Sequence, residues 1–304
     1  MVCGLTRATV SLGLCCVVAT PGVTAGAEQE WHIPEDETLV CNVGSACLEE
    51  YRSANGSHDK VWPEADGKLR QSRIRAEYSR LRLNKYQPVI VPTFTEVGYK
   101  KEKLNPETYA AVMEWYVKEA DNQVVESWPQ DNTYFNHWKV DSVMTTAPSS
   151  VRKRLYRDLL PLMEQWTGLS LNPTACYGVR TYPRDSVLAN HVDRVDTHVI
   201  SAIINLAQSG VDKDWPLFVR GHDGKDNEIF IQPGEIIFYE SASVLHGRPT
   251  PFKGDAFANI FVHFAPTKEW DISSQDVSRA EAEERKMQRL ARRAEEEAAR
   301  TDEL

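Results

Sequence analysis

The chain has 304 residues and a formal net charge of −9. A protein of this length can bury a sizeable core as one large domain or two small ones. The acidic balance disfavours a nucleic-acid-binding protein, which normally presents a basic surface. Apolar residues make up 41% of the sequence and charged residues 26%, a composition typical of a globular protein.

Residues 1–27 have the pattern of a secretory signal peptide. The apolar run Val10–Thr20 is too short to span a bilayer, and an A-x-A cleavage site ends at Ala27. We therefore expect these residues to be removed and the mature chain to have no membrane span. An uncleaved membrane anchor is the alternative interpretation.

Two helices are predicted after a polar N-terminal region at residues 28–100, which itself has a basic, helical stretch near Lys68–Lys85. The first helix begins after Asn105, because an Asn cap is followed by proline and an acidic residue. The second covers Ser150–Trp166. Each carries apolar residues at helical spacing, so both are expected to face a core.

From Ala175 onward the pattern changes to short segments rich in Val, Ile, Tyr and Phe, separated by Gly, Pro and Asp. Many short strands that follow helices predict an α+β, mainly β protein, with a β-barrel or jelly-roll core backed by the N-terminal helices. The expected strands are Ala175–Tyr182, His198–Leu206, Leu217–Gly221, Glu228–Ile231, Ile236–Glu240 and Phe257–Phe264.

Residues 271–304 are expected to form a charged, solvated helical tail, with a coiled-coil partner helix as the alternative. The tail ends in Thr301–Leu304 (TDEL), which resembles the KDEL retrieval signal. Together with the signal peptide, this ending predicts residence in the lumen of the endoplasmic reticulum and binding to a retrieval receptor.

An oxidising lumen has consequences for the cysteines and for one asparagine. Cys41 and Cys47 are close enough in sequence to form a small disulfide loop. Asn55 stands in a glycosylation sequon. Cys176 is expected to be a small buried hydrophobic residue and not a nucleophile.

Three residues have the pattern of a metal site. His191 and Asp193 stand at positions i and i+2, which face the same side of a strand. His246 lies at the end of a later strand segment. Two imidazoles and one carboxylate can hold Fe(II) on one face and leave positions open for a cosubstrate and O2. An H-x-D pair alone is a weak signal, since it also occurs on surfaces and in hydrogen-bonded cores.

The surrounding motifs strengthen this interpretation. The order along residues 175–266 resembles that of the prolyl 4-hydroxylase-like branch of the Fe(II)/2-oxoglutarate dioxygenases. The resemblance implies a double-stranded β-helix core within a domain at residues 101–270. The matching positions are Tyr182, His191, Asp193, the turn Pro233-Gly234-Glu235, His246-Gly247-Arg248-Pro249, Gly254 and Asn259.

The resemblance also implies roles for single residues. His191, Asp193 and His246 would be the metal ligands and the catalytic centre, and Tyr182 would contact 2-oxoglutarate. The implied cofactors are Fe(II), 2-oxoglutarate and O2, with ascorbate as a candidate reductant. The implied reaction hydroxylates a substrate C–H bond and converts 2-oxoglutarate to succinate.

One position departs from the family. A Lys or Arg normally binds the far carboxylate of 2-oxoglutarate, but Asp255 and Ala256 stand at the matching places. We expect Arg248 to replace it, because a guanidinium grips a carboxylate with two hydrogen bonds. Lys253 and then Arg180 are the alternatives. A purely structural role for Arg248 also remains open.

Further residues are assigned to the surroundings of the site. Ser201 and Asn205 alternate along the strand after the H-x-D pair and are expected to line the cosubstrate pocket. His198 and His263 are expected to be structural histidines, and the alternative for His198 is to orient a metal ligand from behind. Trp215 with its neighbours, and residues 128–140, are interpreted either as walls of a substrate channel or as plain packing.

The predicted function is hydroxylation of a secretory-pathway polypeptide, most readily at proline. One alternative is a 2-oxoglutarate oxygenase of another substrate, such as a lysyl or asparaginyl side chain or a small molecule. Another is a non-catalytic lumenal binding module, which the missing Lys or Arg on the last strand favours.

Overall fold

The computed structural model describes residues 67–126, 141–268 and 270–302. The predicted signal peptide, the pair Cys41 and Cys47, the sequon at Asn55 and the stretch 128–140 lie outside these residues, as does the end of the retrieval tetrapeptide. Within the described part of the chain, no helix is both long and apolar enough to cross a membrane.

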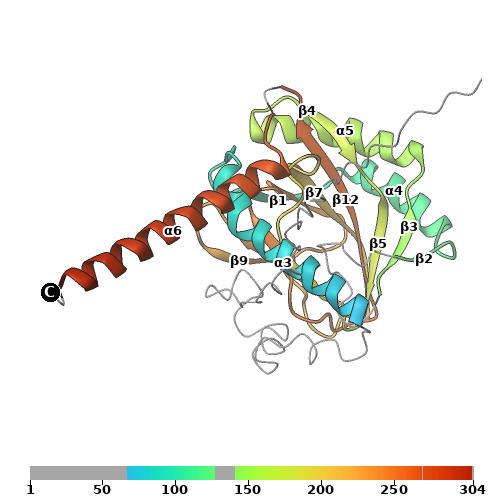
Figure 1. Cartoon of the computed structure of the whole chain (residues 1–304). Coiled ribbons are helices and arrows are strands. Elements are labelled where there is room, and N and C mark those ends of the chain that lie inside the picture. The colour runs from blue at the N-terminus through green and yellow to red at the C-terminus, as the bar shows by residue number, and fades with distance from the viewer. Residues whose placement is uncertain (1–66, 127–140, 269, 303–304) are drawn as a thin grey trace, which may run out of the picture. The chain divides into compact units, whose positions relative to one another are not determined.

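The larger of two β-sheets has eight strands, and each pair of adjacent strands in it is antiparallel (Figure 1). It consists of β1 (Tyr99–Lys103), β2 (Val124–Val125), β3 (Val143–Thr146), β4 (Leu171–Ala175), β5 (Gly178–Pro183), β7 (Ile200–Ser209), β10 (Glu235–Tyr239) and β12 (Ala256–Pro266). The spatial order is β1-β10-β7-β12-β5-β3-β2, and β4 pairs with the C-terminal end of β12.

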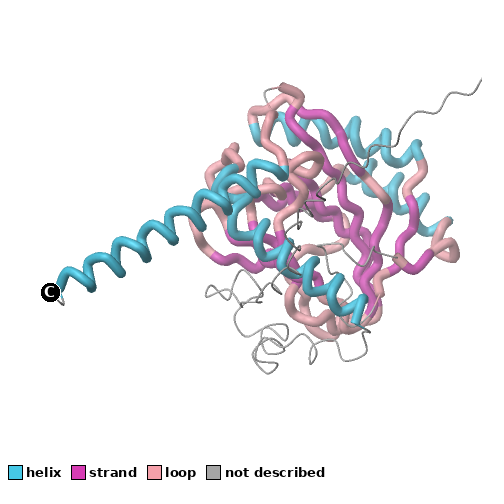
Figure 2. Tube along the Cα trace, viewed as in Figure 1, coloured by secondary structure: helices cyan, strands magenta, loops and turns pink. Residues whose placement is uncertain are grey.

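The smaller sheet has four antiparallel strands in the order β6-β11-β8-β9. From β5 onward the chain passes back and forth between the two sheets. Figure 2 shows the strands of both sheets in magenta. This arrangement confirms the predicted fold class, a mainly β protein with a double-stranded β-helix core. The strands are β6 (Leu188–His191), β8 (Leu217–Arg220), β9 (Asp226–Ile229) and β11 (Leu245–Arg248).

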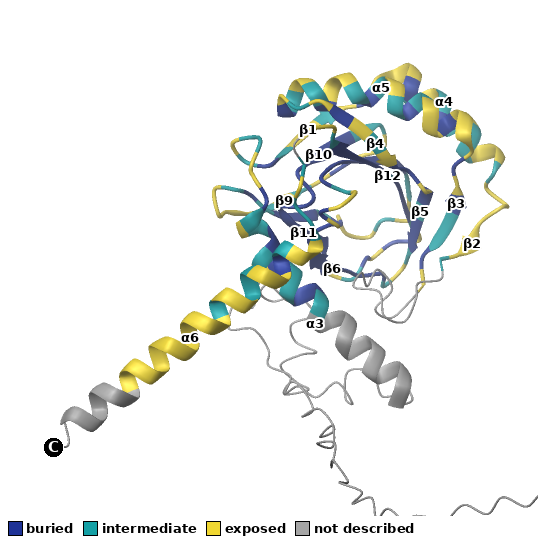
Figure 3. Cartoon of the chain, turned by 45° about the horizontal axis from the view of Figure 1, so that its top comes forward, coloured by how far each residue is buried: buried dark blue, intermediate teal, exposed yellow. Residues whose placement is uncertain are grey.

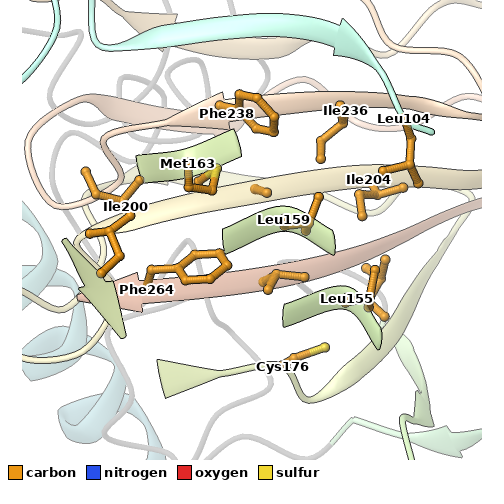
Figure 4. Close-up of a cluster of buried hydrophobic side chains, with 14 of the residues drawn as sticks. Leu104, Leu155, Leu159, Met163, Cys176, Ile200, Ile204, Ile236, Phe238 and Phe264 are labelled. Carbon is orange, nitrogen blue, oxygen red and sulfur yellow. The ribbon is translucent and has the colours of Figure 1, made fainter. Parts of the chain in front are cut away.

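Two helices cover the outer face of the larger sheet. They are α4 (Pro106–Lys118), which the Asn105 side chain caps by accepting from the backbone N–H of Glu107 at 2.8 Å, and α5 (Ser149–Thr167). Both predicted helices are thereby confirmed. Their apolar faces bury a core against the sheet that includes Leu155, Leu159, Met163, Ile200, Ile204, Ile236, Phe238 and Phe264 (Figure 4).

Cys176 belongs to the same core (Figure 4), where it is 3% exposed and forms no disulfide. Burial raises the pKa of its thiol to about 12. A thiol that stays protonated at neutral pH is a poor nucleophile, so the predicted role as a small buried hydrophobic residue is confirmed.

A second core lies between the two sheets. Successive residues of a strand face opposite sides, so on β7 Ile204 packs toward the helices while Ile203 packs toward the smaller sheet. Figure 3 shows buried residues along both sheets. Burial on both faces of β7 explains its nearly continuous apolar sequence. The inner core also supplies the apolar walls of the cavity described below.

Two further helices pack against each other (Figure 1). They are α3 (Gly67–Ile90), which contains the predicted basic helical stretch, and α6 (Ser274–Asp302), the predicted helical tail. Arg82 lies 3.4 Å from Glu281, and Lys85 lies 2.9 Å from Glu284. Exposed side chains dominate the described part of α6 beyond this contact, in agreement with the expected solvated tail.

The six predicted strands correspond to β5, β7, β8, β9, β10 and β12. The pattern did not predict β1 to β4 or the short strand β6, and it indicated β11 only as the end of the strand segment that carries His246. Polar residues make up most of β1, which lies at the edge of the larger sheet and is mostly exposed. β6 has only four residues, which is too short for a detectable alternation.

Candidate active site

A cavity of about 450 Å³ opens between the sheets. Its wall contains polar groups that come from several parts of the fold, among them the end of β6 and the loop after it, β5, β10, β11 and the C-terminal half of β12. Apolar side chains such as Ile203, Leu217 and Phe261 form much of the remaining wall. A largely apolar pocket with a few convergent polar groups is the usual form of a small-ligand or active site.

His191, Asp193 and His246 meet inside this cavity, with one ligand atom of each lying within 4.8 Å of the others. His191 and His246 are directly paired residues of β6 and β11, and their ring centroids are 4.4 Å apart. The carboxylate of Asp193 lies 3.6 Å from Nε2 of His191 and 4.0 Å from Nε2 of His246. All three residues are buried.

The way in which Asp193 reaches the site differs from the expectation. The sequence pattern placed His191 and Asp193 on one strand, but β6 ends at His191 and Asp193 lies in the following loop. The backbone N–H of Asp193 donates to the carbonyl of Ser241 at 2.7 Å. Tertiary contacts, and not strand alternation, therefore orient this carboxylate.

The hydrogen-bond partners of the two histidine rings favour the tautomer in which Nε2 can bind a metal. Nδ1 of His191 lies 2.8 Å from the carbonyl of Ala189, and Nδ1 of His246 lies 2.9 Å from the carbonyl of Val244. A carbonyl only accepts, so each Nδ1 carries the proton and each Nε2 carries the lone pair. Such backing hydrogen bonds are typical of metal-bound histidines.

The charge states also suit a metal. Burial and the neighbouring His191 ring lower the pKa of His246 to about 4, so this ring is neutral at pH 7. Burial alone would raise the pKa of Asp193, but the imidazoles of His191, His246 and His263 hold it well below its usual range. One oxygen, Oδ2, has no hydrogen-bond partner among the described residues. An ionised carboxylate and a neutral imidazole can bind a divalent cation without losing protons.

Arg248 lies at the end of β11 and lines the same cavity, with 2% of its surface exposed. Nη1 donates to the carbonyl of Trp215, whereas Nη2 is buried and has no partner in the described part of the chain. Burial lowers the pKa of Arg248 to about 10, which still leaves it cationic at pH 7. A buried cation without an anionic partner is costly, so this end of the cavity suits an anion.

Aromatic rings fix the plane of this guanidinium. Its central carbon lies 4.8 Å from the ring centroid of Trp215 and 4.7 Å from that of Phe257. Tyr182 is fully buried with its ring centroid 5.1 Å from that of Trp215, in an edge-on contact. The structure thus places Tyr182 beside the aromatic rings that surround Arg248, although it does not line the cavity itself.

The structure does not bring Lys253 to the cavity. Its Nζ forms an ion pair with Asp185, and half of its side chain is exposed. Arg180 does line the cavity, but Nε and Nη2 each donate to Glu126 at 2.5 Å. Both cations therefore have an acidic partner, unlike Arg248, which has none among the described residues.

Ser201 and Asn205 lie on the inner face of β7, as the alternation predicted, but neither lines the cavity. The hydroxyl of Ser201 lies 2.7 Å from Nδ1 of His263. The amide of Asn205 donates to Ala258 and Asn259 and accepts from Gln208. Ser201 therefore holds a residue of the cavity wall, and Asn205 links β7 to β12.

Two histidines that were expected to be structural also line the cavity. The rings of His198 and His263 are 3.9 Å apart, and Nδ1 of His263 lies 3.9 Å from Oδ2 of Asp193. Burial and the neighbouring His198 ring lower the pKa of His263 to about 3. Strand alternation could have found this position, because His263 follows Phe261 at the period of two along β12 and both line the cavity.

Tyr239 was also missed. It lines the cavity, and its ring stands edge-on to His246 with 4.7 Å between the centroids. Burial raises the pKa of its hydroxyl well above the usual value. Its place at the end of an apolar strand gave no sequence signal of proximity to the histidine.

No protein-family model matches the chain, and no curated protein does. Solved structures with a similar fold include a prolyl-4-hydroxylase from Pseudomonas putida (15% identity, 59% of this chain and 98% of that chain, TM-score 0.39). They also include a prolyl hydroxylase from Trichoplax adhaerens in complex with a hypoxia inducible factor peptide fragment (13%, 69% and 97%, 0.45). A third is HygX from Streptomyces hygroscopicus with nickel, 2-oxoglutarate and hygromycin B bound (15%, 60% and 88%, 0.43).

Proposed function

We propose that this protein is an Fe(II)- and 2-oxoglutarate-dependent oxygenase. One observation carries the proposal: a single cavity contains both a buried His-Asp-His cluster and Nη2 of buried Arg248, which has no hydrogen-bond partner among the described residues. 2-Oxoglutarate offers a 2-oxo acid that chelates a metal at one end and a carboxylate at the other. The two features of the cavity match these two ends.

When bound, Fe(II) with 2-oxoglutarate and O2 would supply the oxidation of a substrate C–H bond, coupled to decarboxylation of the cosubstrate to succinate. The protein would contribute the positions of the reactants. His191, Asp193 and His246 would hold the metal from one side and leave its other side open to the cavity. The carboxylate of Asp193 would offset one of its two positive charges.

Arg248 would bind the far carboxylate. The rings of Trp215 and Phe257 leave the guanidinium little freedom to turn, so it is preorganised for a planar anion. The apolar residues Ile203, Leu217 and Phe261 would exclude water from the same space. Exclusion of water strengthens the ion pair and protects a reactive site.

We propose a neutral group in a polypeptide, with proline preferred, as the substrate. The mouth of the cavity includes the exposed apolar side chains of Val124, Val125 and Tyr177, which suit a proline ring. Among the lining residues that the structure describes, the acids are Asp193 and Glu126, and Glu126 is already ion-paired with Arg180. A lysyl ammonium would therefore find no acid ready to receive it, which disfavours a lysyl substrate.

The test is an anaerobic Fe(II) titration followed by measurement of succinate release. We expect Fe(II) to bind, and proline-rich peptides to raise succinate release above the rate without peptide. Turnover with asparagine- or lysine-containing peptides alone would select a different oxygenase substrate. Iron binding with no turnover on any peptide would favour a small-molecule substrate or the non-catalytic binding module. Absence of iron binding would contradict the oxygenase proposal.

We further propose that the protein works in the lumen of the endoplasmic reticulum, on the basis of residues 1–27 and the ending Thr301–Leu304. Deletion of Thr301–Leu304 is expected to cause secretion into the medium, measured by immunoblot. Thr301→Lys, which creates the standard signal, is the matched control and should keep the protein in cells. An unchanged distribution after deletion would contradict the proposal.

A further inference from the structure

The face of α3 that turns toward β6 carries buried polar side chains. Arg80, Asn84 and Gln87 lie at positions i, i+4 and i+7 of the helix, so they share one face. Their exposed fractions are 1%, 3% and 1%. Buried polar side chains usually have hydrogen-bond partners. Here the partners lie in the segment that carries His191 and Asp193.

The first two partners flank a proposed metal ligand. Nδ2 of Asn84 donates to the carbonyl of Asn190 at 2.9 Å, and its Oδ1 accepts from the backbone N–H of Val192 at 3.1 Å. Arg80 donates to the same carbonyl of Asn190. The backbone on both sides of His191 is thus held by α3.

The third side chain holds the other ligand of this segment. Nε2 of Gln87 donates to the carbonyl of Asp193 and to that of Ala242, both at 2.7 Å. Asp193 lies beyond the end of β6, so its carbonyl lacks a partner in the sheet. Gln87 joins this carbonyl to the segment before β11, the strand that carries His246.

We propose that α3 is a positioning element of the metal centre, in which Asn84 and Gln87 fix the segment His191–Asp193 and thereby set the affinity for the metal. The proposal rests on the metal site of the proposed function. The ion pairs of Arg82 and Lys85 with α6 hold the opposite side of α3. A region of the chain outside the β-core would then control how well the core binds its metal.

The test compares Gln87→Met with Leu81→Ala in the full chain, with Ni(II) as the probe. Gln87→Met keeps the length of the side chain but removes its donor. Leu81→Ala removes a buried apolar side chain of the same helix. A leucine side chain forms no hydrogen bond, so this variant is the matched control for loss of stability. Asn84→Leu is the second perturbing variant.

Loss of a partner behind a ligand typically weakens metal binding 10- to 100-fold, so we expect Gln87→Met to raise the Kd for Ni(II) about 10-fold or more. Asn84→Leu should act in the same direction, whereas Leu81→Ala should keep the parent Kd. The visible absorption bands of bound Co(II), which report ligand geometry, should shift in Gln87→Met and in Asn84→Leu but not in Leu81→Ala. An unchanged Kd in Gln87→Met and Asn84→Leu, or an equal rise in Leu81→Ala, would overturn the inference.

Hydrogen exchange on the parent protein makes the test independent of whether the variants fold. If α3 sets the metal affinity, bound Ni(II) must in turn stabilise α3, so its addition should slow exchange in residues 80–90 and leave α5 unchanged. Protection confined to the ligand-bearing strands would contradict the inference. A parent protein that binds neither Ni(II) nor Fe(II) would overturn the proposed function and this inference with it. If the parent and Gln87→Met bind the metal with the same Kd, only this inference is overturned.

Discussion

Asp193→Ala is expected to raise the Kd for Fe(II) more than about 100-fold, because loss of a ligand exceeds the 10- to 100-fold typical of a group behind a ligand. It should also abolish succinate release. The variant removes the only anion of the cluster, and two imidazoles remain. Anaerobic calorimetry with Fe(II), or with Ni(II) as an inert substitute, measures the change directly.

Asp196→Ala is the matched control, since Asp196 is an exposed acid in the same loop. It should bind Fe(II) as the parent does. Equal Fe(II) affinity in Asp193→Ala and the parent would show that the buried cluster is not a metal site. The description of the fold would be unaffected, but the proposed Fe(II)-dependent function would be contradicted.

Arg248→Met is expected to weaken 2-oxoglutarate binding about 100-fold with little change in metal affinity. Removal of one partner from a buried charge pair costs about 3 kcal/mol or more, and each 1.4 kcal/mol corresponds to about a factor of ten. Titration of 2-oxoglutarate into the Ni(II)-loaded protein measures this change.

The thermal stability of the ligand-free protein separates binding from structure in the same variant. Arg248 buries a cation whose Nη2 has no partner among the described residues, so Arg248→Met should leave the stability unchanged or raise it. A merely structural arginine would give the reverse, a lower Tm with normal 2-oxoglutarate binding. Lys253→Met should change neither quantity, because Lys253 pairs with Asp185 away from the cavity.

The sequence was most informative where a side-chain pattern repeats over a long element. The helical spacing in α4 and α5 and the apolar runs of β7 and β12 predicted these elements close to their observed bounds. Short or polar elements such as β6 and β1 gave no comparable signal. Their conformation depends on pairing with β11 and β10, which are distant in sequence.

The choice among three cations shows a similar limit. Arg248, Lys253 and Arg180 all lie close to the motif residues along the chain, and the sequence could only rank them by chemistry. The acids that pair with Lys253 and Arg180 come from other segments, at Asp185 and Glu126. Only the folded chain reveals that Arg248 is the one of these three cations without an acidic partner among the described residues.

By itself, the sequence determined the fold class and the spacing of the His-Asp-His residues, because each depends on local pattern. The signals at residues 1–27 and Thr301–Leu304 stay predictions from the sequence. The tertiary structure decided how Asp193 enters the site, that His198, His263 and Tyr239 line the cavity, and that α3 holds the backbone of the ligand segment. These features depend on contacts between residues up to about a hundred positions apart. Such contacts form only when the chain folds, so no local pattern records them.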